Sequence, residues 1–224
     1  DLLKIKACCV SMDIETSNET LTLHEKSKNV LPFIGIHPEM AQKDPLPVYD
    51  LIEKNYETIT GVGEIGLDRT YIDSDDEWKV QKDVFSKQLS LAEKFNKPVS
   101  IHSRKTLPDI FEILPSYKIP RILLHWFDGN KSQLKTAMDN QYFVSYGPLL
   151  VYANDKQVLL TKTDPSRLLV ETDGPVKFSH CFEYKTTEIM FVSSVIFCAS
   201  KILHTSYENL LAQIEDNSKK FLGI

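Results

Sequence analysis

Ionisable side chains stand at the ends of five short apolar runs in this sequence, and the five are Glu64, His102, His125, Asp173 and His37. A glutamate, two histidines and an aspartate together supply nitrogen and oxygen ligands that suit Zn²⁺, Mn²⁺, Fe²⁺ or Co²⁺. A set richer in oxygen holds Mg²⁺ instead. We therefore predict a metal site whose ligands are Glu64, His102, His125 and Asp173.

Each of these residues also has a simpler interpretation when it is taken alone. A histidine at the end of a strand is more often hydrogen-bonded for structural reasons than bound to a metal. A carboxylate there is often the N-cap of the next helix, and Asp173 before Gly174-Pro175 is a typical turn residue. The joint occurrence of all of them at strand ends is what favours the metal site.

Two classes of segment alternate along the chain, and together they bring these residues to one place. Short runs rich in Val, Ile, Leu, Phe and Tyr are typical of strands buried on both faces of a parallel sheet. We expect these strands at Ile5–Met12, Val30–His37, Gly61–Leu67, Pro98–His102, Arg121–Trp126, Tyr142–Tyr146 and Arg167–Glu171. We expect helices at Thr20–Ser27, Pro47–Lys54, Glu77–Asn96, Leu107–Leu114, Lys131–Asn140, Asn154–Thr161, Thr186–His204 and Ser206–Lys220.

Strands that alternate with helices predict an α/β fold of the TIM-type β/α-barrel class, formed by residues 1–224 as a single domain. In such a barrel the C-terminal ends of the strands converge on the face that carries the active site. A closed barrel needs eight strands, and seven are visible. We expect the first strand to precede Asp1, with Asp1–Leu3 the tail of a helix that followed it. The clearest helix, at 77–96, has Ser74 and Glu77 in the positions of a capping box.

Charge and composition restrict the classes of function. The net charge of −5 argues against a basic clamp on nucleic acid, but it allows a nuclease whose bound metals supply the positive charge. The four cysteines have no CxxC spacing, which favours reduced thiols over a disulfide framework or a zinc knuckle. No apolar run is long enough for a transmembrane helix, and no signal peptide is visible. We therefore expect a cytoplasmic protein that has no membrane association and no obligate protein partner.

Five local motifs resemble those of the TatD family of metal-dependent deoxyribonucleases, which are amidohydrolase-like barrels. The two most specific are Gly-Glu-Ile-Gly-Leu-Asp at 63–68 and Glu-Thr-Asp at 171–173. The others are Gly-Ile-His-Pro at 35–38, Pro-Val-Ser-Ile-His-Ser-Arg at 98–104 and Leu-His-Trp-Phe-Asp-Gly at 124–129. Their order agrees with the family, with 38 residues from Glu64 to His102, 23 more to His125 and 48 more to Asp173. The resemblance covers nearly the whole chain.

The resemblance implies two divalent ions, which we expect to be Zn²⁺, Mg²⁺ or Mn²⁺. Glu64 would bridge the ions or serve either one, His102 and His125 would hold one of them, and Asp173 would hold the other. Asp173 would also accept a proton from the attacking water. Glu64 and Asp173 are thus the residues to which the resemblance gives catalytic roles.

Four further residues have supporting roles in this interpretation. His37 and Arg104 would lie near the scissile phosphate, where the forked guanidinium suits non-bridging oxygens. Their alternatives are a structural hydrogen bond for His37 and a salt bridge for Arg104. We assign Glu171 and Asp68 to the support of a nearby ligand, although Glu171 is also of a size to fill the mouth of the barrel.

One departure from the family pattern concerns its first strand, which ends in His-x-His, both residues being metal ligands. No His-x-His occurs in this sequence, and we expect that the strand was left out of it. The residues present can therefore form one metal position, and the other position is incomplete. A milder departure is Gly174, where the family usually has serine.

The expected activity is hydrolysis of DNA phosphodiester bonds, on single-stranded or end-frayed DNA and from the 3′ side. One alternative keeps the metal and changes the substrate to another ester, an amide or a phosphotriester. The other is a barrel without catalysis, if the His-x-His strand is truly absent. Aromatic residues that follow strand ends would stack on bases or pack at the rim, and Lys177 and His180 would contact substrate or solvent. These aromatic residues are Trp126, Phe127, Tyr146 and Tyr71.

Overall fold

The computed structural model describes residues 5–224, so the expectation for Asp1–Leu3 lies outside the described residues. The chain divides into two compact units, Asp1–Leu123 and Leu124–Ile224, and each is described by itself. The expected extent of a single domain over residues 1–224 stays a prediction. All seven expected strands are present within the part that the structure describes.

Four parallel strands form the sheet of the first unit. They are β1 (Ala7–Val10), β2 (Val30–Ile34), β3 (Gly61–Asp68) and β4 (Val99–Arg104), and they are neighbours in that order. Every residue of β3 is buried, as expected for a strand covered on both faces. The next strand, β5 (Ile122–Leu124), crosses the division between the units in the sequence.

The register between β3 and β4 is irregular at the point where the site forms. Val62 pairs with Val99, but the register shifts before Ile65 pairs with Ile101, so Gly63 and Glu64 lie in the irregularity. Beyond it Gly66 has φ +150° and lies so close to the His102 carbonyl that a Cβ there would collide with it. A glycine is therefore needed for β3 to approach β4 beside His102.

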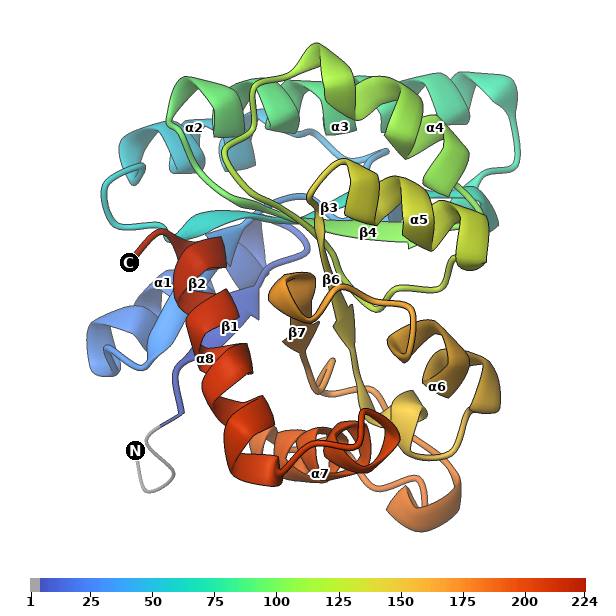
Figure 1. Cartoon of the computed structure of the whole chain (residues 1–224). Coiled ribbons are helices and arrows are strands. Elements are labelled where there is room, and N and C mark those ends of the chain that lie inside the picture. The colour runs from blue at the N-terminus through green and yellow to red at the C-terminus, as the bar shows by residue number, and fades with distance from the viewer. Residues whose placement is uncertain (1–4) are drawn as a thin grey trace. The chain divides into compact units, whose positions relative to one another are not determined.

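Helices α2 (Leu46–Lys54), α3 (Asp75–Lys94) and α4 (Leu107–Ile113) lie as a layer over β3 and β4 (Figure 1). The long helix α3 buries one face against β3. The structure corrects the expected capping box at its start. Ser74 accepts the Glu77 N–H, but the Glu77 side chain accepts from the N–H of Asp73 rather than from that of Ser74. Short 3₁₀ turns η1 (Pro38–Met40), η2 (Arg69–Tyr71) and η3 (Leu114–Ser116) follow β2, β3 and α4.

Helix α1 (Ile14–Lys26) begins six residues earlier than the sequence predicts. Asp13 is its N-cap, and its side chain accepts the N–H and the hydroxyl of Thr16. The Thr16 hydroxyl oxygen in turn accepts the N–H of Asp13, which completes a capping box. The cap sets the start of this helix, because its first turn has little apolar periodicity.

The second unit contains the parallel pair β6 (Phe143–Tyr146) and β7 (Leu168–Val170). Its helices are α5 (Lys131–Asp139), α6 (Asn154–Leu160), α7 (Val192–Ile202) and α8 (Tyr207–Leu222), with 3₁₀ turns η4 (Pro148–Val151), η5 (Pro165–Arg167), η6 (His180–Phe182) and η7 (Ile189–Phe191). The helix expected from Thr186 starts only at Val192. An isolated bridge pairs Thr186 with Lys177, and the buried Thr187 bonds to the Val176 carbonyl, which holds this segment extended.

Among residues 5–224, no one helix has both the length and the apolar character that a membrane crossing requires. Only a pair bent by 113°, Ile189–Ile202 with Tyr207–Leu222, meets the length and composition requirements when taken together.

Candidate metal centre

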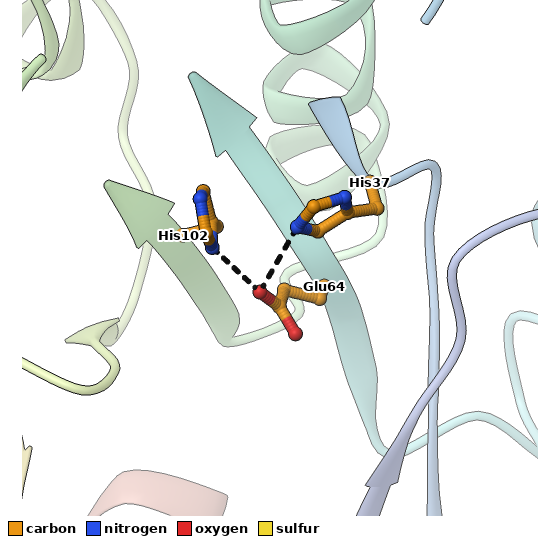
Figure 2. A group of neighbouring side chains, drawn as sticks. All are labelled: His37, Glu64 and His102. Carbon is orange, nitrogen blue, oxygen red and sulfur yellow. Dashed lines mark hydrogen bonds and ion pairs between the residues drawn. The ribbon is translucent and has the colours of Figure 1, made fainter. Parts of the chain in front are cut away.

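Glu64, His37 and His102 form a cluster of possible metal ligands in the first unit. Glu64 comes from the register irregularity of β3, His102 from the neighbouring β4, and His37 from the segment after β2. Glu64 Oε1 lies 3.0 Å from His102 Nδ1 and 3.5 Å from His37 Nε2. Both rings are directed at this oxygen in Figure 2. One ligand atom from each residue lies within 4.8 Å of the other two, which is close enough for one ion to reach all three.

The two rings of this cluster also contact each other, edge to face. Their centroids are 4.6 Å apart and their planes are inclined at 71°. His37 and Glu64 are buried, and His102 is slightly more exposed. A carboxylate with this little solvent around it needs positive charge or hydrogen-bond donors close by.

Asp68 supports His102 from the side away from Glu64. Its Oδ2 lies 2.9 Å from His102 Nε2, and its Oδ1 accepts the N–H and the hydroxyl of Thr70. Burial acts to raise the pKa of Asp68, but the hydrogen bonds from His102 and Thr70 outweigh it and hold that pKa below its ordinary value. Asp68 is therefore a carboxylate, and an Nε2–H of His102 donates to it. With an ion bound between His102 and Glu64, this hydrogen bond would leave the lone pair of Nδ1 for the ion, the arrangement usual for a metal-binding histidine.

His37 has the opposite arrangement. Its Nδ1 accepts the backbone N–H of Glu39 at 3.2 Å, as the N-cap of η1. A neutral His37 ring must then have its proton on Nε2, the atom that faces Glu64. The ring thus offers a hydrogen-bond donor rather than a lone pair. Its position makes His37 a possible ligand, but its hydrogen bonding favours contact with an anionic oxygen.

In the second unit, as in the first, a carboxylate lies beside a predicted histidine ligand. His125 follows β5, and its Nδ1 lies 3.6 Å from Glu171 Oε2, which also accepts a hydrogen bond from the Ser145 hydroxyl at 2.7 Å. The Ser145 oxygen accepts the N–H of Trp126, the residue after His125. Ser145 was missed from the sequence, although a serine within the otherwise apolar run 143–146 is a visible signal.

Asp173 follows β7 and has a left-handed backbone, with φ +51°. Trp126, directly after His125, has φ +40°. Positive φ is uncommon outside glycine, and such residues gather at functional sites. The assignment of His125 and Asp173 as ligands, and of Glu171 as their support, stays a prediction.

Two further predicted residues lie at the end of the sheet in the first unit. Arg104 ends β4 opposite Asp68 in the register, and its side chain is exposed. Tyr71, in η2, contacts the His37 ring edge to face at 6.0 Å and is 40% exposed. Burial, followed by the charges of nearby carboxylates, raises the pKa of Tyr71. Both side chains are accessible, and their contact with substrate stays a prediction.

The aromatic residues of the second unit differ in exposure. Phe127 and Tyr146 are buried, and the Tyr146 hydroxyl bonds to Thr163, so neither presents a face for base stacking. Trp126 is half-buried against Phe178. The loop residues Lys177 and His180 are exposed, and the His180 ring stacks on Tyr152 at 4.3 Å.

The chain matches the family described as "TatD related DNase" over residues 3–223. It is 26% identical over 223 residues to YabD of Bacillus subtilis, described as an uncharacterized metal-dependent hydrolase, with 96% of this chain and 86% of YabD covered. It is 32% identical over 158 residues to the mouse putative deoxyribonuclease TATDN3. That match covers 65% of this chain and 54% of the mouse protein.

Solved structures of low sequence identity confirm the fold class predicted from the sequence. The structure of the TatD homologue YjjV from Escherichia coli superposes with a TM-score of 0.86 at 23% identity, over 96% of this chain and 85% of YjjV. A TatD family hydrolase from Entamoeba histolytica superposes with a TM-score of 0.79 at 18% identity, over 93% and 80% of the two chains.

Proposed function

The chain belongs to the TatD related DNase family, and on that premise we propose that it is a metal-dependent deoxyribonuclease that hydrolyses DNA phosphodiester bonds. The observation that carries the proposal is the arrangement of Glu64, His102 and Asp68. A carboxylate and a ring nitrogen lie 3.0 Å apart, and a second carboxylate supports the other nitrogen of that ring. This donor set supports the proposal of a hydrolytic metal site over a purely structural ion pair.

The donor set fits the proposed ions. Glu64 and His102 would be ligands in the first unit, and we propose His125 and Asp173 as ligands in the second on the strength of their motifs. Mixed imidazole and carboxylate ligands suit Zn²⁺ and Mn²⁺, and an oxygen-rich position suits Mg²⁺. Such an ion, when bound, supplies positive charge that stabilises the charge developing on a phosphodiester during hydrolysis.

Other residues of the chain would bind and orient the substrate. The Nε2–H of His37 is placed to donate to an anionic oxygen, and the exposed guanidinium of Arg104 suits two phosphate oxygens at once. Asp173 would accept a proton from the attacking water. We propose single-stranded or end-frayed DNA as the substrate. The net charge of −5 offers no general attraction to a duplex, so local positive charge has to bind the phosphate.

The test is a cleavage assay with labelled single-stranded DNA, frayed duplex, a carboxyl ester and a phosphotriester, each with added Mn²⁺, Mg²⁺ or Zn²⁺. We expect DNA to be cleaved and EDTA to stop the reaction. Glu64→Gln keeps the size of the side chain but removes its charge. We expect it to lower kcat/KM by more than the 10–100-fold typical of residues that only support a ligand.

Glu53→Gln is the matched control, because Glu53 is an exposed glutamate of the same unit that pairs with Lys94. It should cleave DNA at the wild-type rate. Cleavage that survives EDTA, or that is undiminished in Glu64→Gln, contradicts the proposal. Preferential cleavage of the ester or the phosphotriester would replace the substrate but keep the metal.

A further inference from the structure

Two buried glutamines lie on the inner face of α3, which is otherwise largely apolar. Gln81 is 1% exposed and Gln88 is fully buried. They are seven residues apart, so after about two turns they face the same side of the helix. A primary amide without partners is costly to bury, so the contacts of these two side chains explain their place in the core.

Gln81 bonds to two segments that carry site residues. Its Oε1 accepts the N–H of Asp68 at 2.8 Å, and its Nε2 lies 3.3 Å from both the Asp68 carbonyl and the Pro38 carbonyl. Asp68 is the carboxylate that fixes His102, and Pro38 directly follows His37. One amide therefore links the end of β3 to the start of η1.

Gln88 makes the same kind of contact with a single residue. Its Oε1 accepts the N–H of Ile36 at 2.6 Å, and its Nε2 donates to the Ile36 carbonyl at 3.1 Å. Ile36 directly precedes His37. The backbone around His37 is thus held on one side by Gln88 and on the other by Gln81, but only Gln81 reaches the support of His102.

We propose that Gln81 is a positioning residue of the metal centre, which it controls through the backbone of Asp68. The inference rests on the proposed metal site. A site binds its ion well only when its ligands are held within about 0.5 Å of their working geometry. By fixing the backbone of Asp68, Gln81 sets the place of the carboxylate, and the carboxylate sets the orientation of the His102 ring. Gln88 acts on His37 alone, so it positions a substrate contact and not a metal ligand.

The neutral amide suits this position better than a charged group. Gln81 must accept from one N–H and donate to two carbonyls, which a carboxylate cannot do. A glutamate here would also add a second negative charge beside Asp68. The residue type is therefore matched to both the hydrogen bonds and the charge of its neighbours.

The experiment measures Mn²⁺ affinity by calorimetric titration of metal-free protein, with urea unfolding alongside. Gln81→Met keeps the length of the side chain and removes all three hydrogen bonds. We expect its Mn²⁺ dissociation constant to rise about 10-fold, within the range seen when the support of a ligand is lost. Excess Mn²⁺ should restore its DNA cleavage. Gln88→Met, the matched change on the same face, should bind Mn²⁺ within about twofold of wild type.

Asn217→Leu controls for the loss of a buried amide as such. Asn217 is fully buried in α8 and donates to the carbonyls of Pro165 and Leu168, neither of which belongs to the cluster. The Asn217→Leu variant should unfold at a lower urea concentration than wild type and keep the Mn²⁺ affinity of wild type. If Gln81→Met does not fold, Gln81→Glu, which keeps the acceptor oxygen, should show the same loss of affinity.

The outcomes separate this inference from the proposed function. If the wild-type protein binds no Mn²⁺, Mg²⁺ or Zn²⁺, the proposed function fails, and this inference fails with it. If wild type binds Mn²⁺ and a folded Gln81 variant binds it equally well, the positioning role is overturned and the proposed function stands. Equal losses of affinity in the Gln81 and Gln88 variants also overturn the role assigned here.

Discussion

The two histidines beside Glu64 differ at the ring nitrogen that faces away from it. In His102 that nitrogen is hydrogen-bonded to Asp68, whereas in His37 it accepts the N–H of Glu39. In a neutral ring, the proton of His102 is therefore on the nitrogen that faces away from Glu64, whereas the proton of His37 is on the nitrogen that faces it. Distance alone would group them as equal ligands, but their hydrogen bonds give them different chemistry.

This difference predicts separate effects of the two substitutions on metal binding. His102→Ala removes a lone-pair donor, so we expect it to weaken Mn²⁺ binding by at least about 100-fold, the upper end of what loss of a supporting residue costs. His37→Ala removes an N–H donor, so Mn²⁺ affinity should change by less than about threefold while the KM for DNA rises. Titration calorimetry and steady-state cleavage measure the two quantities. Equal losses of Mn²⁺ affinity in both variants would make His37 a ligand and refute the interpretation of its tautomer.

At the scale of elements, the cap of α1 predicts a pH-dependent contribution to stability. The pKa of Asp13 is lowered from its ordinary 3.8, chiefly by the hydrogen bond from the Thr16 N–H. Desolvation acts in the opposite direction but is outweighed. A lowered pKa in the folded state means that this stability is fully present above pH 3.8 and is lost as the pH falls through the folded-state value. Asp13→Ala should cost about 1 kcal/mol above pH 3.8 and progressively less below it.

Asp13→Asn is the matched variant, because an asparagine caps a helix about as well but does not titrate. Urea unfolding of wild type, Asp13→Ala and Asp13→Asn at a series of pH values gives the comparison. A difference between wild type and Asp13→Ala that stays constant across this range would show that the charge of Asp13 does not contribute to the cap.

The sequence predicts the strands well and the helix starts less well, for a physical reason. A strand buried on both faces needs a largely apolar run, and such runs stand out in the sequence at 122–124 and 168–170. The first turn of α1 depends instead on the cap made by Asp13 and Thr16, which periodicity does not detect. The segment after Lys185 has a helical composition, but its bridge to residue 177 holds it extended.

The sequence predicts those residues of the candidate site whose own side chains are possible metal ligands. Glu64 and His102 stand in recognisable motifs, and the structure places them within β3 and β4 and 3.0 Å apart at their nearest side-chain atoms. Gln81 acts through the backbone of Asp68, and such a contact depends on tertiary packing that no local pattern records. Its one visible signal is a polar amide on an otherwise largely apolar helix face.

At the scale of the whole molecule, metal binding and folding stability are linked. An ion that binds the folded protein but not the unfolded chain stabilises it by RT ln(1 + [L]/Kd), about 2.7 kcal/mol at 100 times Kd. For a chain of 224 residues each kcal/mol shifts the melting temperature by about 2–4 °C. Saturating Mn²⁺ should therefore raise the melting temperature of metal-free wild type by about 5–10 °C.

The Glu64→Gln variant distinguishes two causes of a rise in melting temperature, which are Mn²⁺ binding at a specific site and general screening of the acidic surface by Mn²⁺. The substitution changes the net charge only from −5 to −4, so weak binding of Mn²⁺ to surface carboxylates should persist in it. The shift produced by a site that contains Glu64 should be lost. Differential scanning calorimetry of both proteins, before and after addition of Mn²⁺ and then of EDTA, measures the difference. A shift of the same size in Glu64→Gln would place the stabilising ion away from Glu64, and a shift that EDTA does not reverse would exclude equilibrium binding as its cause.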